Sequence, residues 1–169
     1  LRDIIENSKD LILLTGNSRD FFGKLFQANK IKNFEEIIGL LKKDFKDRLY
    51  FEIQRHDDKD EKNFENTLLN YSKSLNIPLI ATQEVYYLNK EMYEAHDALR
   101  CIGEKSFVDD KNRFKLSNQH FLKTNDEIAK LYSDIPEALE NNYNFHLRFN
   151  FKPKKSKPIL PSIAHSENN

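Results

Sequence analysis

Three short polar segments, each directly after an apolar run, hold side chains that suit chemistry. They are Gly16-Asn17, Gln54-Arg55-His56 and Gln83-Glu84-Val85-Tyr86. Carboxylate, imidazole and amide groups bind metal ions, and the first two also transfer protons. In folds built from alternating strands and helices, such groups gather at the carboxyl ends of the strands. We therefore expect a site where these three segments meet.

His56 ends one of these segments, where it could approach a metal ion or a phosphate. It is followed by the charged residues 57–60, so a solvated loop between strand and helix is the favoured interpretation. The charged run 57–62 also lacks the ligand spacing of an EF-hand, which argues against a calcium loop.

The other histidines and the single cysteine give weaker signals. His96 suits either an interface contact or a hydrogen bond at the start of a helix, and the second is favoured. His120, His146 and His165 have no partners at ligand spacing, so we expect structural or exposed roles. Cys101 is expected to be a packed thiol on an apolar helix face. A lone cysteine excludes an internal disulfide and a cysteine-rich zinc site.

The runs that precede the polar segments are predicted strands. Leu11–Thr15 and Leu79–Thr82 are continuous apolar runs, typical of buried strands, and the first is expected to be buried on both faces. Arg48–Gln54 is rich in aromatic and branched residues, which also favours a strand. Each run is followed by apolar residues at helical spacing. Strands that alternate with helices predict a parallel sheet or part of a barrel.

Helices are predicted from apolar residues at helical spacing and from capping motifs. Asn33 with Glu36 resembles a capping box, and Thr124 with Glu127 forms a second one. Pro136 suits the first turn of a last helix. The predicted inward stripes include Phe64, Leu68, Tyr71 and Leu75, then Met92, Ala95, Leu99 and Ile102, and finally Leu139, Tyr143 and Leu147.

Composition limits the class of protein. The chain has 169 residues, and its 27 basic and 27 acidic side chains cancel; 38% of the residues are hydrophobic, typical of a globular domain. Zero net charge argues against an autonomous nucleic-acid binder, and no apolar run approaches the about 20 residues of a membrane span. The chain begins with Leu1 and has no signal-peptide pattern, so we expect a piece of a longer protein.

Five stretches together point to a family. They are LILLTG (11–16), YFEIQRH (50–56), IPLIATQEVYYL (77–88), EAHDALRCI (94–102) and FLKTNDEIAKLYSDIPEALEN (121–141). In this order and with these gaps, the chain resembles the PHP (polymerase and histidinol phosphatase) domain of the alpha subunit of bacterial DNA polymerase III. PILPS (158–162) is similar to the family's passage into the polymerase core.

The resemblance implies an α/β fold. It implies the C-terminal strands and helices of a partial (β/α)7 PHP-type barrel, followed by a helical extension. Residues 1–103 would form the C-terminal half of the barrel and 104–151 the extension. Residues 152–169 would be a basic, proline-rich connector toward the polymerase palm. The family's early His-x-His motif and its palm aspartates would lie outside this chain.

The resemblance also implies a site for divalent metals such as zinc, manganese or magnesium. Asn17 stands where the family has a cysteine ligand, and Glu84 and Tyr86 replace an Asp-x-His pair, with His56 near the site. Asn17 is a poor substitute for a thiolate, and Tyr86 is neutral near pH 7. Glu84 keeps the charge but is longer by one methylene. We therefore predict a degraded metal site, no catalytic residue and no bound cofactor in this chain.

The function that the resemblance implies is part of a DNA-directed DNA polymerase, a nucleotidyltransferase of DNA replication in the bacterial cytoplasm. The chain alone is expected to be inactive and to serve as a structural and subunit-docking scaffold. Its expected partners are the rest of the alpha subunit, a proofreading exonuclease subunit and other replisome subunits. DNA would be bound only through the intact polymerase, and no membrane is expected.

Two alternatives stay open. One is an active metal-dependent phosphoesterase or 3′–5′ exonuclease, and the other is the same domain of an error-prone translesion paralogue. The lysines of 152–157 suit either DNA phosphate contacts in the intact enzyme or a solubilising linker.

Overall fold

A parallel sheet lies at the centre of the computed structural model, which describes residues 1–158. In this range the strands β1 (Leu13–Leu14), β2 (Leu49–Ile53) and β3 (Leu79–Ala81) pair in the order β1-β2-β3. Both pairings are parallel, with Leu13 opposite Leu49 and Phe51 opposite Leu79. The mixed α/β architecture with a parallel sheet is therefore confirmed.

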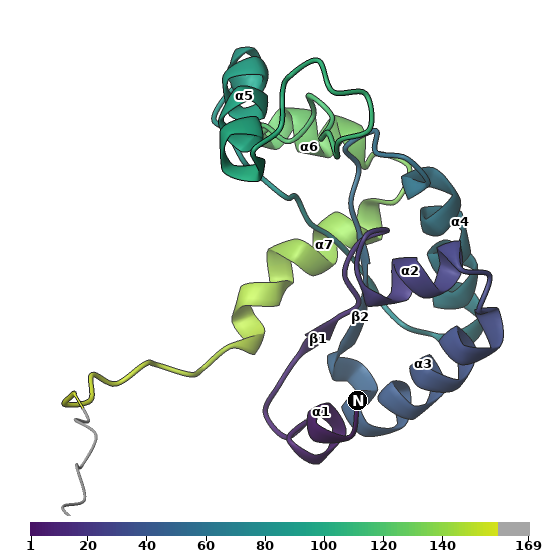
Figure 1. Cartoon of the computed structure of the whole chain (residues 1–169). Coiled ribbons are helices and arrows are strands. Elements are labelled where there is room, and N and C mark those ends of the chain that lie inside the picture. The colour runs from purple at the N-terminus through teal and green to yellow at the C-terminus, as the bar shows by residue number, and fades with distance from the viewer. Residues whose placement is uncertain (159–169) are drawn as a thin grey trace, which may run out of the picture.

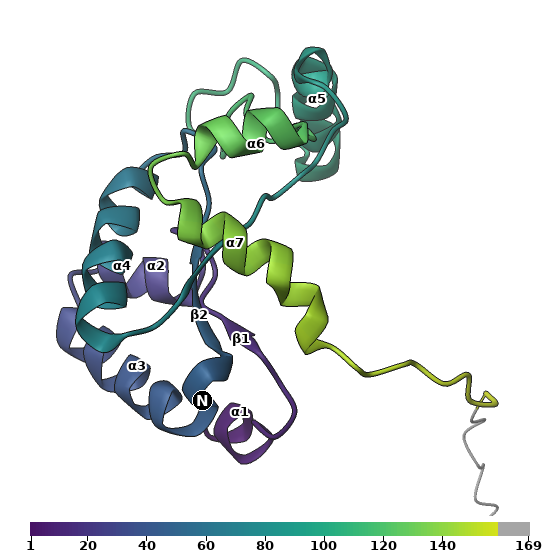
Figure 2. The same ribbon diagram turned by 180° about the vertical axis from the view of Figure 1, so that it is seen from behind.

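The helices surround this sheet in an unequal way (Figures 1 and 2). In both views α2, α3 and α4 lie together on one side of the strands, and α5 and α6 lie beyond the ends to which the strands run. α7 packs against β3, where the Asn141 side chain donates a hydrogen bond to the Leu79 carbonyl at 2.7 Å. The helices are α1 (Arg2–Glu6), α2 (Phe21–Gln27), α3 (Ile31–Phe45), α4 (Glu61–Leu75), α5 (Tyr93–Glu104), α6 (Asn125–Leu131) and α7 (Pro136–Phe145), with 3-10 turns at Lys46–Arg48, Lys90–Met92 and His146–Arg148.

The core forms where β2 meets α3 and α4. α3 buries one face at helical spacing, and α4 buries Phe64 and Leu68. Residues of the predicted extension share this core, since Tyr132, Ile135 and Ala138 are all buried in it. The Tyr132 hydroxyl lies 3.2 Å from the carbonyl oxygens of Ile53 and Thr82 and so ties the α6–α7 turn to β2 and β3. The boundary at 103/104 stays a prediction.

Of four local predictions, about three helix starts and the burial of one strand, two hold and two do not. Thr124 and Glu127 form the expected reciprocal capping box, and Pro136 is the first residue of α7. The box at Asn33 is wrong, because α3 already begins at Ile31 and places Asn33 in its first turn. The Leu11–Thr15 run is also not a strand buried on both faces. β1 has two residues, both half-buried, because among residues 1–158 it is an outer strand of the sheet that pairs with β2 alone.

The predicted inward face of α5 lies outward. Leu99 and Ile102 are 65% and 76% exposed, while Asp97 and Cys101 on the opposite face are buried. The cause is the loop after α5, whose Arg113 reaches back and forms a two-pronged ion pair with Asp97 at 2.6 and 2.5 Å. The buried position of Cys101 confirms the packed thiol.

The predicted inward stripe of the last helix is also only partly buried. Tyr143 and Leu147 of the α7 stripe are largely exposed, whereas Leu139 packs against the core. Residues 152–158 are exposed and have no regular structure. The remainder of the predicted connector, most of the PILPS stretch and His165 lie outside the described residues. Over residues 1–158 no helix combines the length and apolarity that crossing a membrane requires.

Candidate functional site

The three polar segments named from the sequence meet at the carboxyl ends of the strands. The Asn17 side-chain amide donates to Gln54 Oε1 at 3.2 Å, which joins the segments after β1 and β2. The Glu84 backbone N–H donates to His56 Nε2 at 3.2 Å, which joins those after β2 and β3. The parallel order of the strands thus brings residues from distant parts of the sequence to one edge.

Asn17 is held in a tight turn. Gly16 has a φ of +79°, and a Cβ at that position would lie 2.5 Å from Asp20 Oδ2, so the turn requires glycine. The Asn17 backbone N–H donates to Asp20 Oδ2 at 2.9 Å, and Asn17 Oδ1 accepts the backbone N–H of Arg19 at 2.8 Å. With its amide nitrogen on Gln54, the Asn17 side chain has its oxygen and its nitrogen engaged within the protein.

Glu84 is surrounded by donors. Its Oε2 forms an ion pair with the Arg19 guanidinium, and its Oε1 accepts the Tyr86 hydroxyl at 2.6 Å. Burial raises the pKa of Tyr86, and so does its hydrogen bond to Glu84, which keeps the phenol protonated. Tyr86 therefore acts as a donor to Glu84, and each Glu84 carboxylate oxygen already has a partner within the protein.

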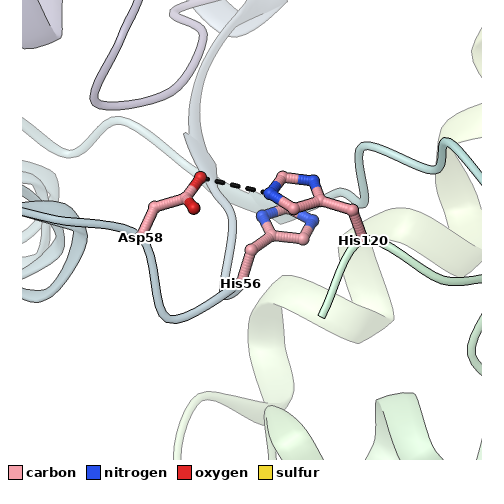
Figure 3. Close-up of side chains that lie close together, drawn as sticks. All are labelled: His56, Asp58 and His120. Atoms are coloured by element: carbon pink, nitrogen blue, oxygen red, sulfur yellow. Dashed lines mark hydrogen bonds and ion pairs between the residues drawn. The ribbon is translucent and has the colours of Figure 1, made fainter. Parts of the chain in front are cut away.

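A second cluster lies beside Glu84 and consists of His56, Asp58 and His120 (Figure 3). His56 is 1% exposed and His120 is fully buried, so the predicted solvated position of His56 is wrong. The two imidazole rings stack in parallel, with centroids 4.1 Å apart and an interplanar angle of 2°. Asp58 Oδ2 lies 3.2 Å from His120 Nε2.

Hydrogen bonds define the state of each ring nitrogen. His56 Nε2 accepts the Glu84 N–H, so its Nδ1 is the nitrogen that carries hydrogen, and it faces Glu61 Oε1 at 3.3 Å. His120 Nδ1 faces the Glu84 carbonyl oxygen at 3.1 Å, and its Nε2 faces Asp58. Both ring nitrogens of His120 thus face oxygen atoms of the protein.

Asp58 is ionised in this setting. Burial raises the pKa of its carboxyl, but the His120 hydrogen bond and the positive charge of Arg19 outweigh burial, and the net pKa lies below its ordinary value. Arg19 Nη2 is 3.7 Å from Asp58 Oδ2, so the same guanidinium contacts both Asp58 and Glu84.

The donor set does not fit a divalent ion held by both rings, although the ligand atoms of His56, Asp58 and His120 lie within 4.8 Å of one another. A nitrogen lone pair lies in the plane of its ring, and a bound metal sits about 2.1 Å from the nitrogen near that plane. The His56 and His120 rings are stacked in parallel planes, so no single position lies in both ring planes at bonding distance from a nitrogen of each ring. His56 Nε2 also already accepts a backbone N–H.

Sequence reasoning missed His120 and Asp58 because they are 62 residues apart. The Tyr87–Phe121 parallel bridge brings His120 to this edge, and the Tyr86 N–H donates to the His120 carbonyl at 2.9 Å. The predicted hydrogen-bonding role of His96 finds no support, since its ring packs against Tyr86 and Tyr87.

The fold and this edge define an α/β protein whose parallel strands deliver a polar, ion-paired cluster at their carboxyl ends. No protein-family model matches the chain. Several similar proteins are named DNA polymerase III subunit alpha. The one from Caulobacter vibrioides is 36% identical over 160 residues, or 95% of this chain. Those from Rickettsia bellii and Borreliella burgdorferi are 35% and 34% identical over 96% and 94% of it.

Along nearly its whole length, the chain is thus homologous to one segment of DNA polymerase III subunit alpha. It spans 14% of the length of each of these three relatives. The predicted resemblance to that subunit is confirmed, and its assignment to the PHP domain stays a prediction.

Proposed function

We propose that this chain is the C-terminal half of a PHP-type barrel in the alpha subunit of a replicative, DNA-directed DNA polymerase. In this proposal it serves as a structural and subunit-docking scaffold without a working metal site. The observation that carries the proposal is the engagement of the family's ligand positions with each other and with Arg19. The homology to subunit alpha supports the assignment to the polymerase.

The contacts at the strand ends support the scaffold role in this proposal. Hydrolysis by a metal cluster needs open coordination positions and a bound water. In place of metal contacts, the Asn17 side chain bonds to Gln54, and the Glu84 carboxylate accepts the Tyr86 hydroxyl and pairs with Arg19. These contacts join three segments that follow three different strands, which stabilises the edge of the sheet.

Metal analysis of the complete subunit, combined with a nuclease assay, tests this proposal. After dialysis against zinc or manganese, we expect no ion that depends on Glu84 and no 3′–5′ exonuclease activity. Glu84→Gln should leave both results unchanged, and Glu65→Gln serves as the matched control, since Glu65 lies on α4 and pairs with Arg55. Stoichiometric metal that Glu84→Gln removes would refute the scaffold proposal.

The second candidate is a metal-dependent phosphoesterase or exonuclease. The observation that favours it is the closeness of the His56, Asp58 and His120 ligand atoms. It predicts nuclease activity that His120→Asn abolishes, in the same assay as above. The parallel stack of the two rings argues against this candidate.

The proposed partners are the rest of the alpha subunit, a proofreading exonuclease subunit and other replisome subunits, in the cytoplasm. The homologous region is 14% of subunit alpha, so most of that protein lies outside it. We expect the 169-residue chain alone to show no primer extension, because in this proposal the palm aspartates lie outside it. Nucleotide incorporation by the purified chain would contradict this assignment.

A further inference from the structure

A hollow between the ends of α3 and α4 and the side of α7 lies where the strands begin. Its lining includes Asp47, just before β2, and Pro78, just before β3, and Asn141 of α7 contributes to its wall. The hollow has a volume of about 930 Å³. It therefore lies at the amino ends of the strands, at the opposite end of the sheet from the candidate site.

Positive charge borders this hollow without an ion-pair partner. The lysines that line it are Lys42, Lys43, Lys46 and Lys73. Among residues 1–158, none of these four takes part in an ion pair. Of the two carboxylates in the lining, Asp47 pairs with Arg148 at 2.6 Å, which leaves Glu137. The zero net charge of the chain thus hides a strongly basic hollow.

The helix dipoles explain only part of this arrangement. Lys42 and Lys43 lie in the last turn of α3 and Lys73 in the last turn of α4, where a cation stabilises the negative end of a helix. That effect does not require two helix ends to share one hollow, and like charges gathered around it repel each other. An anion bound in the hollow would offset this repulsion.

Exposed aromatic rings lie along the part of α7 that reaches the hollow and just after it. Arg148 contacts Asp47 of the hollow, and the nearby Tyr143, Phe149 and Phe151 are 77%, 54% and 83% exposed. The segment that follows extends away from the rest of the chain (Figures 1 and 2) and carries further lysines, namely Lys152, Lys154, Lys155 and Lys157. Lysines for phosphates beside rings on which bases can stack are typical of surfaces that bind single-stranded nucleic acid.

We propose that the basic hollow and the exposed aromatic end of α7 together bind a single strand of DNA, with the lysines on its phosphates and the rings on its bases. This inference rests on the proposed function, which places the chain in a DNA polymerase. An acidic peptide would match the charge of the hollow but would make no use of the three exposed rings. A duplex keeps its bases stacked inside and would leave the rings unused as well.

The first test measures how the complete subunit alpha binds a fluorescent oligo-dT strand as the KCl concentration rises. One combined variant carries Lys42→Gln, Lys43→Gln, Lys46→Gln and Lys73→Gln. Each lost phosphate contact makes the slope of log K against log salt shallower by about 0.7, so the loss of two or more contacts should change it by about 1.4 or more.

The matched control removes the same charge from the other end of the sheet. It combines Lys90→Gln, Lys105→Gln, Lys111→Gln and Lys130→Gln, which are exposed residues in and around α5 and α6. This control should keep the slope of the unchanged subunit. Equal slopes for the two combined variants would overturn the proposal.

The second test concerns the rings. Phe151→Ala should weaken the binding of oligo-dT by about tenfold, as the loss of one stacked base predicts, and should leave the salt slope unchanged. Phe107→Ala is the matched control, since Phe107 is 78% exposed in the loop after α5. Equal effects of these two variants, or an equal loss of affinity for a DNA duplex, would overturn the single-strand assignment.

Ultraviolet cross-linking of oligo-dT to the unchanged subunit gives a readout that needs no variant. We expect cross-linked peptides that contain Tyr143, Phe149 or Phe151. Cross-links found solely in other parts of the subunit would overturn the proposal, and so would polyglutamate that displaces the strand as effectively as oligo-dT does. None of these results depends on metal or nuclease activity. Their failure would leave the proposed scaffold role intact, whereas metal that depends on Glu84 would overturn that role without affecting them.

Discussion

Removing the Arg55 guanidinium should destabilise the chain more than the loss of any exposed ion pair. Arg55 follows β2 and contacts Glu65 of α4 at 3.0 and 2.5 Å and Asp134, in the turn between α6 and α7, at 2.6 and 2.9 Å. It also donates to the Leu131 carbonyl and stacks over the Tyr132 ring. These hydrogen bonds raise its pKa further above the ordinary value.

The magnitude follows from the burial of the partners. Asp134 is 62% exposed, so water replaces its contact and this pair contributes at most about 1 kcal/mol. Glu65 is only 12% exposed, and leaving such a carboxylate unpaired costs about 3 kcal/mol. Arg55→Met should therefore lower the free energy of unfolding by about 3–4 kcal/mol. For a chain of this size the melting temperature should fall by about 6–16 °C.

Thermal and urea unfolding of the purified chain, followed by circular dichroism, measures this loss. Arg2→Met is the matched control, because its pair with Glu6 lies on the surface and should contribute under about 1 kcal/mol. Adding Glu65→Leu to Arg55→Met removes the buried charge and should recover part of the loss. The reasoning is refuted if Arg55→Met and Arg2→Met cost the same, or if Glu65→Leu recovers nothing.

Two further predictions concern α5. Leu99→Lys should change the free energy of unfolding by under about 0.5 kcal/mol, because the side chain faces solvent. Cys101→Lys should cost several times more, because Cys101 lies on the buried face. Equal urea midpoints for the two variants would contradict the assigned faces. The Arg113 hydrogen bonds hold the pKa of Asp97 below its ordinary value. A lowered folded-state pKa means that the pair stabilises the chain above the unfolded value of about 4, and that this stability is lost as the pH falls through the folded-state pKa. Asp97→Asn should therefore reduce the pH dependence of urea unfolding below pH 4, and an unchanged slope would argue against the pair.

The parts of the fold that the sequence predicted are those in which local pattern and tertiary packing agree. α4 buries Phe64 and Leu68 as its spacing predicts, and β2 and β3 lie within their apolar runs. Thr124 and Glu127 are a local signal, because each bonds to the backbone of the other within one turn. Such features need no knowledge of distant residues.

The face of α5 could not be predicted in this way. Periodicity identifies which residues share a face, but it does not determine which face a neighbouring loop covers. Arg113 lies 16 residues from Asp97, and only the folded loop brings the two charges together. The ion pair then turns a polar face inward and leaves Leu99 and Ile102 to the outside.

The candidate site, too, could be predicted only in part. The rule that side chains gather at the carboxyl ends of parallel strands located the edge, and Asn17, His56 and Glu84 do meet there. Their partners are Arg19 and His120, which the spacing along the chain did not single out. The sequence therefore indicated where the side chains gather, whereas the contacts of Arg19 with Asp58 and Glu84 became visible only in the folded chain. A substitution at a metal ligand is best judged together with the nearest cation that can reach the remaining carboxylates, because their charge must be balanced in either case.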